Sequence, residues 1–328
     1  MTYLALIAGL VLLAFGGEYL VRGAVALAKR LGVSPLLIGL TLVGFGTSCP
    51  ELVASVQAAL IGSPGIAVGN VVGSNILNIL LILGITAVIS SLATSPQVLR
   101  RDGMVLLGAS LAMVAVCLVG AVGRLGGSLL VGALLLYLVF TYRTERAHPN
   151  GSAELHIAEA ELVAPLPRSL WLAVVEALLG LAAVVGGAYL LVNAAIVIAR
   201  QFGVSETVIG LTIVAGGTSL PELVTSVVAA LRRHGDVALG NIIGSNIFNI
   251  LGIIGVTALV RPIAVPDEIV RFDLWVMLAV ALLLVVFAKT GWRLSRWEGA
   301  VFLAGYGVYL FALLSPDARE LLGISYAS

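Results

Sequence analysis

Charged residues are scarce in this sequence: only 11% of its 328 residues are Asp, Glu, Lys or Arg, while 60% are hydrophobic. A soluble globular protein is about one quarter charged and about half apolar. The composition therefore excludes an ordinary soluble domain and predicts a polytopic membrane protein. The net charge of +1, without a basic patch that contains aromatic residues, gives no indication of nucleic-acid binding.

Thiols and imidazoles are also few. The two cysteines, Cys49 and Cys117, lie in apolar segments, where we expect small hydrophobic side chains and neither a disulfide nor a metal pair. The three histidines lie in polar breaks between the apolar runs: His148, His156 and His234. The sequence has no His-Glu-x-x-His run and no Ser/Lys dyad, so we expect neither an intramembrane enzyme nor a cofactor.

Ten apolar runs of spanning length are separated by charged or turn-rich breaks, so we expect an all-α protein with ten transmembrane helices. The first run has no basic segment before it and continues to full spanning length. We therefore expect a membrane helix there and not a cleaved signal. The predicted ranges are 3–28, 35–62, 66–90, 103–121, 125–142, 169–199, 206–231, 236–259, 271–288 and 297–314.

One long polar segment, 143–168, divides the sequence into halves of five predicted helices each, 1–142 and 169–328. The predicted loops on the side of this segment hold twelve Lys and Arg residues, against five on the other side. The positive-inside rule then places the segment in the cytoplasm and both termini outside. The twelve are Lys29, Arg30, Arg100, Arg101, Arg143, Arg146, Arg168, Arg232, Arg233, Lys289, Arg293 and Arg296.

The two halves repeat the same polar motifs. Residues 41–60, TLVGFGTSCPELVASVQAAL, align without gaps on 212–231, TIVAGGTSLPELVTSVVAAL, with 14 of 20 residues identical. The same offset of 171 aligns 69–80 on 240–251, with 9 of 12 identical. Because each half has an odd number of predicted helices, the second half enters the membrane from the opposite side. We therefore expect two inverted-topology repeats of five, with a midplane site formed by the second, third, seventh and eighth helices.

Each repeated motif carries one glutamate deep within an apolar run, Glu51 in the first half and Glu222 in the second. A charge near the bilayer centre costs at least about 2.5–3.5 kcal/mol, so it needs a partner. Glu18, also deep, has Arg22 one helical turn away, and we expect a structural ion pair between them. Glu51 and Glu222 have no Lys or Arg within a turn. Brought together by the repeat, their two negative charges match one divalent cation.

The residues around each glutamate offer further oxygen atoms. A threonine and a serine precede each glutamate on the same helix face: Thr47, Ser48, Thr218 and Ser219. A proline before each glutamate lacks an N–H, so we expect it to free an earlier carbonyl, Pro50 that of Gly46 and Pro221 that of Gly217. Polar side chains recur on one face of the third and eighth helices: Asn70, Ser74, Asn78, Asn241, Ser245 and Asn249.

This donor set consists of carboxylates, hydroxyls, amide oxygens and carbonyls, which suit hard cations such as Ca²⁺ and Na⁺ better than zinc or copper. The residues alone thus indicate a transporter of alkali or alkaline-earth cations. Other interpretations stay open. The carboxyls could be protonated by burial and purely structural, and the hydroxyls could bond to their own helices. Asn75 and Asn246 fit helix packing better than ligation, while Asn70 and Asn241 fit both.

The paired motifs resemble those of a known family. G-T-S-x-P-E together with G-N-x-x-G-S-N-x-x-N, present in both halves, resembles the alpha repeats of the Ca²⁺/cation antiporter superfamily, most of all the prokaryotic sodium/calcium exchangers. The resemblance covers all ten predicted helices, with 1–142 and 169–328 as the two exchanger repeats. It implies a secondary active antiporter in the plasma (inner) membrane that exchanges Na⁺ for Ca²⁺ by alternating access.

The resemblance also implies roles for individual residues. Glu51 and Glu222 would hold Ca²⁺, and the first and sixth helices would slide across the others as a gating pair. Asn249 stands where some relatives, including potassium-dependent exchangers, carry Asp, which makes a K⁺ requirement less expected. The implied cation ligands are Glu51, Glu222, Thr47, Ser48, Thr218, Ser219, Ser74, Asn78, Ser245, Asn249 and the carbonyls of Gly44 and Ala215.

Other functions remain open at this point. The same site would also serve Ca²⁺/H⁺ exchange or K⁺-dependent Na⁺/Ca²⁺ exchange. A cation channel is an alternative from another class, although channels usually build carboxylate rings by oligomeric symmetry. The expected partners are the two ions and the lipid bilayer, and the sequence gives no oligomeric state.

Overall fold

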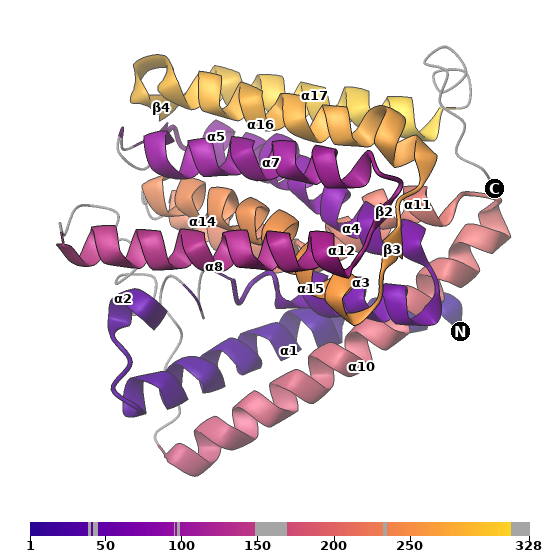
Figure 1. Cartoon of the computed structure of the whole chain (residues 1–328), viewed down its shortest axis with the longest axis horizontal. Helices are drawn as coiled ribbons and strands as arrows, with labels where there is room; N and C mark the ends of the chain where they lie inside the picture. Colours follow the sequence, from indigo (N-terminus) through magenta and orange to yellow (C-terminus); the bar gives the residue numbers. More distant parts are fainter. Residues whose placement is uncertain are drawn as a thin grey trace.

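Helices make up nearly all of the computed structural model, which describes residues 1–38, 41, 45–94, 96, 99–147, 169–231 and 235–315 (Figure 1). The predicted linker 143–168 lies mostly outside these residues, but its first residues continue a helix to Ala147. Gly44, one of the implied cation ligands, also lies outside them.

In the first half, long helices alternate with short pieces of π-helix and strand. The elements are α1 (Thr2–Arg30), α2 (Pro35–Ile38), α3 (Cys49–Ile61), α4 (Pro64–Leu77), the π-helical η2 (Asn78–Leu83), α5 (Gly84–Ile89), β1 (Leu92–Ala93), the π-helical η3 (Leu99–Gly103), α7 (Met104–Cys117), β2 (Ala121–Val122) and α8 (Arg124–Ala147). The second predicted helix, 35–62, is therefore helical at its two ends and not one continuous helix.

The second half follows the same order. Its elements are α10 (Leu170–Phe202), α11 (Glu206–Ile209), the π-helical η4 (Gly210–Val214), α12 (Ala215–Thr218), α13 (Leu220–Leu231), α14 (Gly235–Phe248), the π-helical η5 (Asn249–Ile254), α15 (Gly255–Val260), β3 (Ile263–Ala264), the π-helical η6 (Ile269–Asp273), α16 (Leu274–Lys289), the 3₁₀ turn η7 (Thr290–Trp292), β4 (Arg293–Leu294) and α17 (Arg296–Leu314). The offset of 171 that aligns the sequences also aligns η2 with η5 and β1 with β3.

The chain is a membrane protein with multiple apolar helices. Within the described residues, seven helical segments are long and apolar enough to cross a membrane, and an eighth is 206–231 if its two bent parts form one span. The predicted second and fourth spans fall short of this test. Only the 13-residue α3 follows the break in the former, and the continuous helix of η3 and α7 has three charged residues in its first turn, Arg100, Arg101 and Asp102.

Two small antiparallel strand pairs connect the halves. Leu92 of β1 pairs with Leu294 of β4, and Ala121 of β2 pairs with Ala264 of β3. The two pairs lie at opposite ends of the helical bundle (Figure 1). Each pair joins a turn of the first half to a turn of the second half, so the halves are connected at both ends.

Helices α4 and α14 form the centre of the core. Every residue of α4 from Gly65 to Leu77 is buried. The α4 backbone passes very close to η4, because a Cβ on Gly73 would lie 2.5 Å from the Leu211 carbonyl oxygen. Only small residues permit this approach. The polar residues of the repeated motifs are thereby held away from the lipid.

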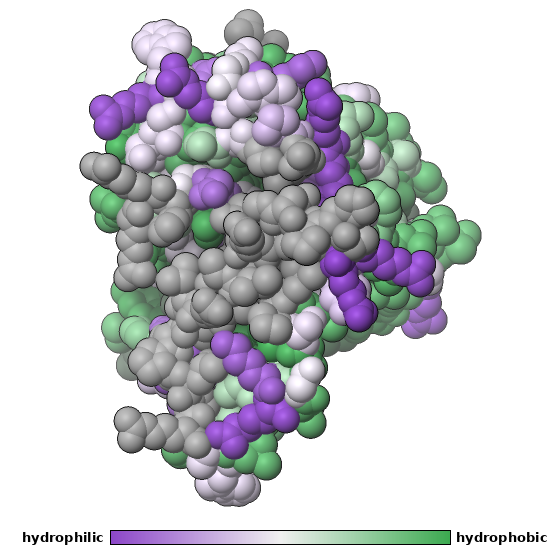
Figure 2. All heavy atoms as spheres, turned by 90° about the vertical axis from the view of Figure 1, so that its left-hand side faces the viewer, coloured by the Kyte–Doolittle hydropathy of each residue, from purple (hydrophilic) through white to green (hydrophobic). Residues whose placement is uncertain are grey.

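Basic residues gather at one end of the bundle. The end where α1 and α8 terminate and where β4 lies is at the left of Figure 1 and faces the viewer in Figure 2, where hydrophilic side chains appear at several places on it. Hydrophobic side chains appear around its margin in the same view. The elements that meet at this end carry Lys29, Arg30, Arg100, Arg101, Arg143, Arg146, Lys289, Arg293 and Arg296.

Helices α1 and α10 lie side by side and antiparallel along one edge of the bundle (Figure 1). Glycines allow their backbones to touch. A Cβ on Gly16 would lie 2.8 Å from the Val184 amide nitrogen, and one on Gly187 would lie 2.9 Å from the Leu13 amide nitrogen. A Cβ on Gly180 would collide with the Leu20 amide nitrogen. This seam requires glycine and joins the two helices into one unit.

We expect Gly180→Ala to lower the melting temperature of the purified protein in detergent. Alanine stabilises an exposed helix position by up to about 1 kcal/mol relative to glycine. At Gly180 the added methyl group would force α1 and α10 apart, and overpacking of this kind costs about 1–3 kcal/mol. Thermal unfolding followed by intrinsic fluorescence measures the difference.

Gly186→Ala on the same helix is the matched control, because no atom lies within 4 Å of the position its Cβ would occupy. We expect this variant to melt at or slightly above the wild-type temperature. Equal melting temperatures for the two variants would contradict direct backbone contact between α1 and α10.

Candidate cation-binding site

The chain that carries Glu51 is not helical just before this residue. Residues 45–48 form turns, and α3 begins at Cys49 with Pro50 in its first turn. Proline is tolerated there because first-turn amides have no partner within the helix. The Cys49 amide donates a hydrogen bond of 3.2 Å to the Gly46 carbonyl. The prediction that Pro50 frees this carbonyl is therefore wrong, because the tight turn supplies another donor.

The corresponding break in the second half lies at Ser219, between α12 and α13, where the chain bends by 48°. The Ser219 amide donates to the Ala215 carbonyl at 3.0 Å, and the Thr218 hydroxyl lies 3.3 Å from the same oxygen. The Ala215 carbonyl, an implied cation ligand, is thus engaged within its own helix in this conformation.

Glu51 and Glu222 are fully buried, each with 0% of its surface exposed. Each glutamate accepts a hydrogen bond from the serine of the other half. Ser219 Oγ donates to Glu51 Oε1 at 2.9 Å, and Ser48 Oγ donates to Glu222 Oε1 at 2.8 Å. The two motifs therefore meet, as the sequence predicted from their repetition. Neither glutamate has an ion pair within the described part of the chain.

Several oxygens around the two glutamates are buried and have no hydrogen-bond partner. They include the second carboxylate oxygen, Oε2, of both Glu51 and Glu222. A buried polar atom without a partner is costly, so such atoms mark places where a ligand completes the structure. The other unpartnered oxygens from the predicted set are Thr47 Oγ1, Ser74 Oγ, Ser245 Oγ, Asn78 Oδ1 and Asn249 Oδ1. This donor set fits a hard cation.

Side-chain amides connect α4 and η2 to α14. Asn78 Nδ2 donates to Asn246 Oδ1 at 2.9 Å, and Asn246 Nδ2 donates to the Asn75 carbonyl at 3.3 Å. Both ends of the Asn246 amide are thus engaged, so this residue packs the helices as the sequence interpretation preferred. Asn75 donates to the carbonyl of Val71 on its own helix at 2.8 Å, while its Oδ1 is unpartnered.

The two halves are not equivalent at the next pair of asparagines. Asn70 Nδ2 lies 3.1 Å from the Glu51 carbonyl and 2.9 Å from Ser55 Oγ. Its Oδ1 lies 3.1 Å from the hydroxyl of Thr218. The corresponding atoms of the other half, Asn241 Nδ2, Ser226 Oγ and Thr47 Oγ1, are buried without a partner. The structure therefore holds Thr218 in a hydrogen-bond network and leaves Thr47 outside one.

Arg22 pairs with a residue that the sequence did not indicate. Its Nη2 lies 3.5 Å from Glu176 Oε1 of α10, whereas the side chain of Glu18 is exposed. The predicted Glu18–Arg22 pair is therefore wrong. Spacing along one helix suggested that pair, but the antiparallel packing of α1 on α10 places Glu176 opposite Arg22. The ion pair adds a polar contact to the glycine seam.

Helix α1 also touches both breaks. A Cβ on Gly17 would lie 3.5 Å from the Pro50 ring, and one on Gly217 would collide with the side chain of Leu10. The α1–α10 unit thus lies directly against the segments that carry the two serines. A displacement of this unit would therefore act directly on the segments that carry the two serines.

Comparisons with known proteins agree with these motifs. A family model described as sodium/calcium exchanger protein matches residues 1–143 and 172–315. The putative antiporter CaxA of Alkalimonas amylolytica is 40% identical over 310 residues, which cover 94% of this chain and 97% of that protein. The sodium/calcium exchanger MaX1 of Methanosarcina acetivorans is 36% identical over 350 residues, which cover 95% of this chain and 98% of that protein.

A solved structure is similar over the same length. It is the sodium-calcium exchanger NCX_Mj soaked with 10 mM Na⁺ and 10 mM Sr²⁺. The superposition has a TM-score of 0.64 at 32% sequence identity and covers 96% of this chain and 98% of that one. The similarity thus includes the whole helical bundle and not only the repeated motifs.

We expect Ser48→Ala to weaken Ca²⁺ binding by about tenfold or more. The substitution removes an oxygen from the site and the hydroxyl that orients Glu222. A hydrogen bond to a charged group contributes about 1.5–3 kcal/mol, and 1.4 kcal/mol corresponds to a factor of ten. Isothermal titration calorimetry with CaCl₂ in sodium-free buffer measures the affinity.

The matched control is Ser110→Ala. Ser110 is equally buried, but its hydroxyl bonds to the Leu106 carbonyl of its own helix, α7. This variant should bind Ca²⁺ as the wild type does. An unchanged affinity in Ser48→Ala would show that the serine bond across the two halves does not support the site.

Proposed function

Because this chain belongs to the sodium/calcium exchanger family, we propose that it is a secondary active antiporter that exchanges Na⁺ for Ca²⁺. The family consists of transporters and not of enzymes. The observation that carries the proposal is the pair of fully buried glutamates. Each accepts a hydrogen bond from the serine of the other half, and each has one carboxylate oxygen without a hydrogen-bond partner. Na⁺ and Ca²⁺ are the cargo in this proposal, and no cofactor is needed.

Charge balance supports one Ca²⁺ at the centre of the site. Two ionised carboxylates without a basic partner repel each other in a medium of low dielectric constant. One divalent cation cancels their charge and is coordinated by Oε2 of Glu51 and Oε2 of Glu222. The proposed ligand set keeps all of the residues implied by the sequence. Ala215 joins it only if the Thr218 hydroxyl and the Ser219 amide turn away from its carbonyl.

Na⁺ would be coordinated by the same two carboxylates and by the flanking oxygens. Ser74 and Ser245 each leave a buried hydroxyl oxygen without a partner, and Asn78 and Asn249 leave amide oxygens. These atoms are neutral, so they suit a monovalent ion better than they suit Ca²⁺. Competition for Glu51 and Glu222 then couples the transport of the two ions, because the site cannot be fully occupied by Ca²⁺ and by Na⁺ at the same time.

We propose ten membrane spans arranged as two inverted repeats, 1–142 and 169–328, joined by a cytoplasmic linker at 143–168. The recurrence of η2 as η5 and of β1 as β3 at the sequence offset of 171 supports the repeat. The basic end of the bundle supports the orientation, since the cytoplasmic side of a membrane protein is enriched in Lys and Arg. Both termini then lie outside the plasma membrane.

Alternating access follows from the α1–α10 unit. The glycine seam holds the two helices together, and α1 lies against Pro50 and Gly217. The buried α4 and α14 hold the remaining ligands in place. We propose that the unit slides across this core and exposes the two glutamates first to one side of the membrane and then to the other.

Counter-ion dependence of ⁴⁵Ca²⁺ uptake into proteoliposomes tests the function. An outward Na⁺ gradient should drive uptake, whereas an outward H⁺ gradient or an added K⁺ gradient in the absence of Na⁺ should not. Uptake driven by a pH gradient alone would establish Ca²⁺/H⁺ exchange instead. Single-channel currents without counter-ion dependence would establish a channel.

We expect Glu51→Gln and Glu222→Gln each to reduce Na⁺-driven ⁴⁵Ca²⁺ uptake to background. Glutamine keeps the shape and a hydrogen-bond acceptor but removes the negative charge, so the site no longer neutralises a divalent ion. Initial rates are compared at equal protein density in the liposomes.

Glu18→Gln is the control, because this exposed carboxylate also lies on a membrane helix but outside the site. Its uptake should remain close to the wild-type rate. Substantial uptake by either site variant would overturn the assignment of Glu51 and Glu222.

A further inference from the structure

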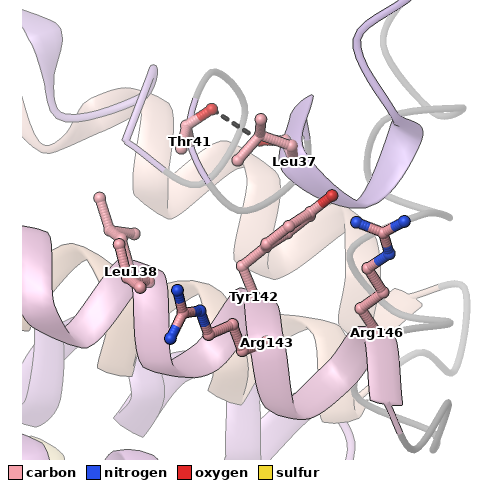
Figure 3. A pocket seen from close by; sticks show the side chains of 7 residues that line it. Leu37, Thr41, Leu138, Tyr142, Arg143 and Arg146 are labelled. Atoms are coloured by element: carbon pink, nitrogen blue, oxygen red, sulfur yellow. Dashed lines mark hydrogen bonds between the residues drawn. The ribbon is translucent and has the colours of Figure 1, made fainter.

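A cavity of about 650 Å³ lies between the C-terminal part of α8 and the short helix α2. Leu37 and Thr41 line one wall, and the other wall is α8 (Figure 3). In Figure 3 the ring of Tyr142 extends from α8 toward Leu37, with Arg143 on one side and Arg146 on the other. None of the proposed cation ligands that the structure describes lines this cavity.

The α8 wall changes from apolar to cationic within two helical turns. The residues that line the cavity are Leu138 and Val139, then Tyr142 and Arg143, then Arg146. This spacing places them on one stripe of the helix. The cavity therefore has an apolar half and a half with two guanidinium groups and a phenol. No carboxylate is among the described residues that line it.

The two arginines are exposed, and the described part of the structure gives neither of them an ion pair. They lie on the terminal turns of α8, at the hydrophilic end of the bundle shown in Figure 2. Outward-facing apolar side chains lie one or two turns deeper on the same helix, with Leu136 73% and Phe140 57% exposed. The cavity thus lies where the apolar belt meets the basic end.

The opposite wall is connected to the proposed gating unit. Ile38 of α2 is fully buried against Val25 and Ala28 of α1. A molecule held between α2 and α8 would therefore link the end of α1 to a helix outside the α1–α10 unit. Its occupancy would affect how easily α1 moves.

We propose that this cavity binds one anionic phospholipid. The phosphate would be bound by Arg143 and Arg146, with the Tyr142 hydroxyl as a further donor, and an acyl chain would lie along Leu37, Leu138 and Val139. Basic pockets between membrane helices at the cytoplasmic face suit such headgroups. Arginine donates two parallel hydrogen bonds to a phosphate, which fixes the headgroup more firmly than charge alone.

Native mass spectrometry of the purified full chain tests the binding. The wild type should retain phosphatidylglycerol in preference to phosphatidylcholine. The double variant Arg143→Ala/Arg146→Ala should bind phosphatidylglycerol about 30-fold more weakly, because each basic residue near an anionic headgroup contributes about a factor of five. Glycerol phosphate, which has the charge but no acyl chain, should not displace the lipid at equal concentration.

Arg124→Ala is the matched control, since Arg124 is an exposed arginine at the opposite end of the same helix. It should keep the wild-type lipid preference. An equal loss of phosphatidylglycerol binding in this variant, or no loss of it in the double variant, would overturn the proposal. Displacement by glycerol phosphate would also overturn it, because the ligand would then be a soluble phosphate. This readout does not depend on transport.

Reconstitution measures the consequence for the gating unit. Na⁺-driven ⁴⁵Ca²⁺ uptake by the wild type should differ at least twofold between liposomes that contain phosphatidylglycerol and liposomes of phosphatidylcholine alone. The double variant should show the same rate in both. A lipid dependence that survives in the double variant would show that the lipid acts elsewhere.

Discussion

Two buried carboxylates, each bonded to the serine of the other half and without a basic partner in the part of the chain that the structure describes, constrain the rest of this structure. Glu51 and Glu222 cannot remain ionised in an apolar interior unless hydrogen bonds and a cation offset their charge. The chain supplies the hydrogen bonds by exchanging serines between its halves. That exchange requires both helices to break just before the glutamate, so that Ser48 and Ser219 can turn toward the opposite motif.

The surrounding architecture keeps these breaks away from lipid. Non-helical backbone within a membrane is tolerated only where protein or a cavity covers it. Here the buried α4 and the mostly buried α14 cover the breaks on one side, and α1 covers them on the other through Gly17 and Leu10. Thr218, which bonds to Asn70, and Thr47, which has no partner, differ in this conformation, so the two halves are not equivalent around the site.

Repetition made much of the site predictable from the sequence. A glutamate that occurs twice at the same place in two aligned segments indicated a shared site, and the structure brings Glu51, Glu222 and both serines together. Contacts between helices were not predictable in the same way. The pair Arg22–Glu176 depends on the register of α1 against α10, and the hydrogen bond from Cys49 to Gly46 depends on the path of one turn. The difference between Thr47 and Thr218 depends on the conformation of the whole molecule, which two equivalent motifs cannot specify.

The position of a bound divalent ion tests the central claim most directly. Crystals of the purified protein grown without sodium and soaked with Sr²⁺ would give an anomalous difference map. The account predicts one strong Sr²⁺ peak that bridges Glu51 Oε2 and Glu222 Oε2, and a loss of that peak when Na⁺ replaces Sr²⁺ in the soak. A strong peak elsewhere, with these two carboxylates bonded only to protein atoms, would contradict it.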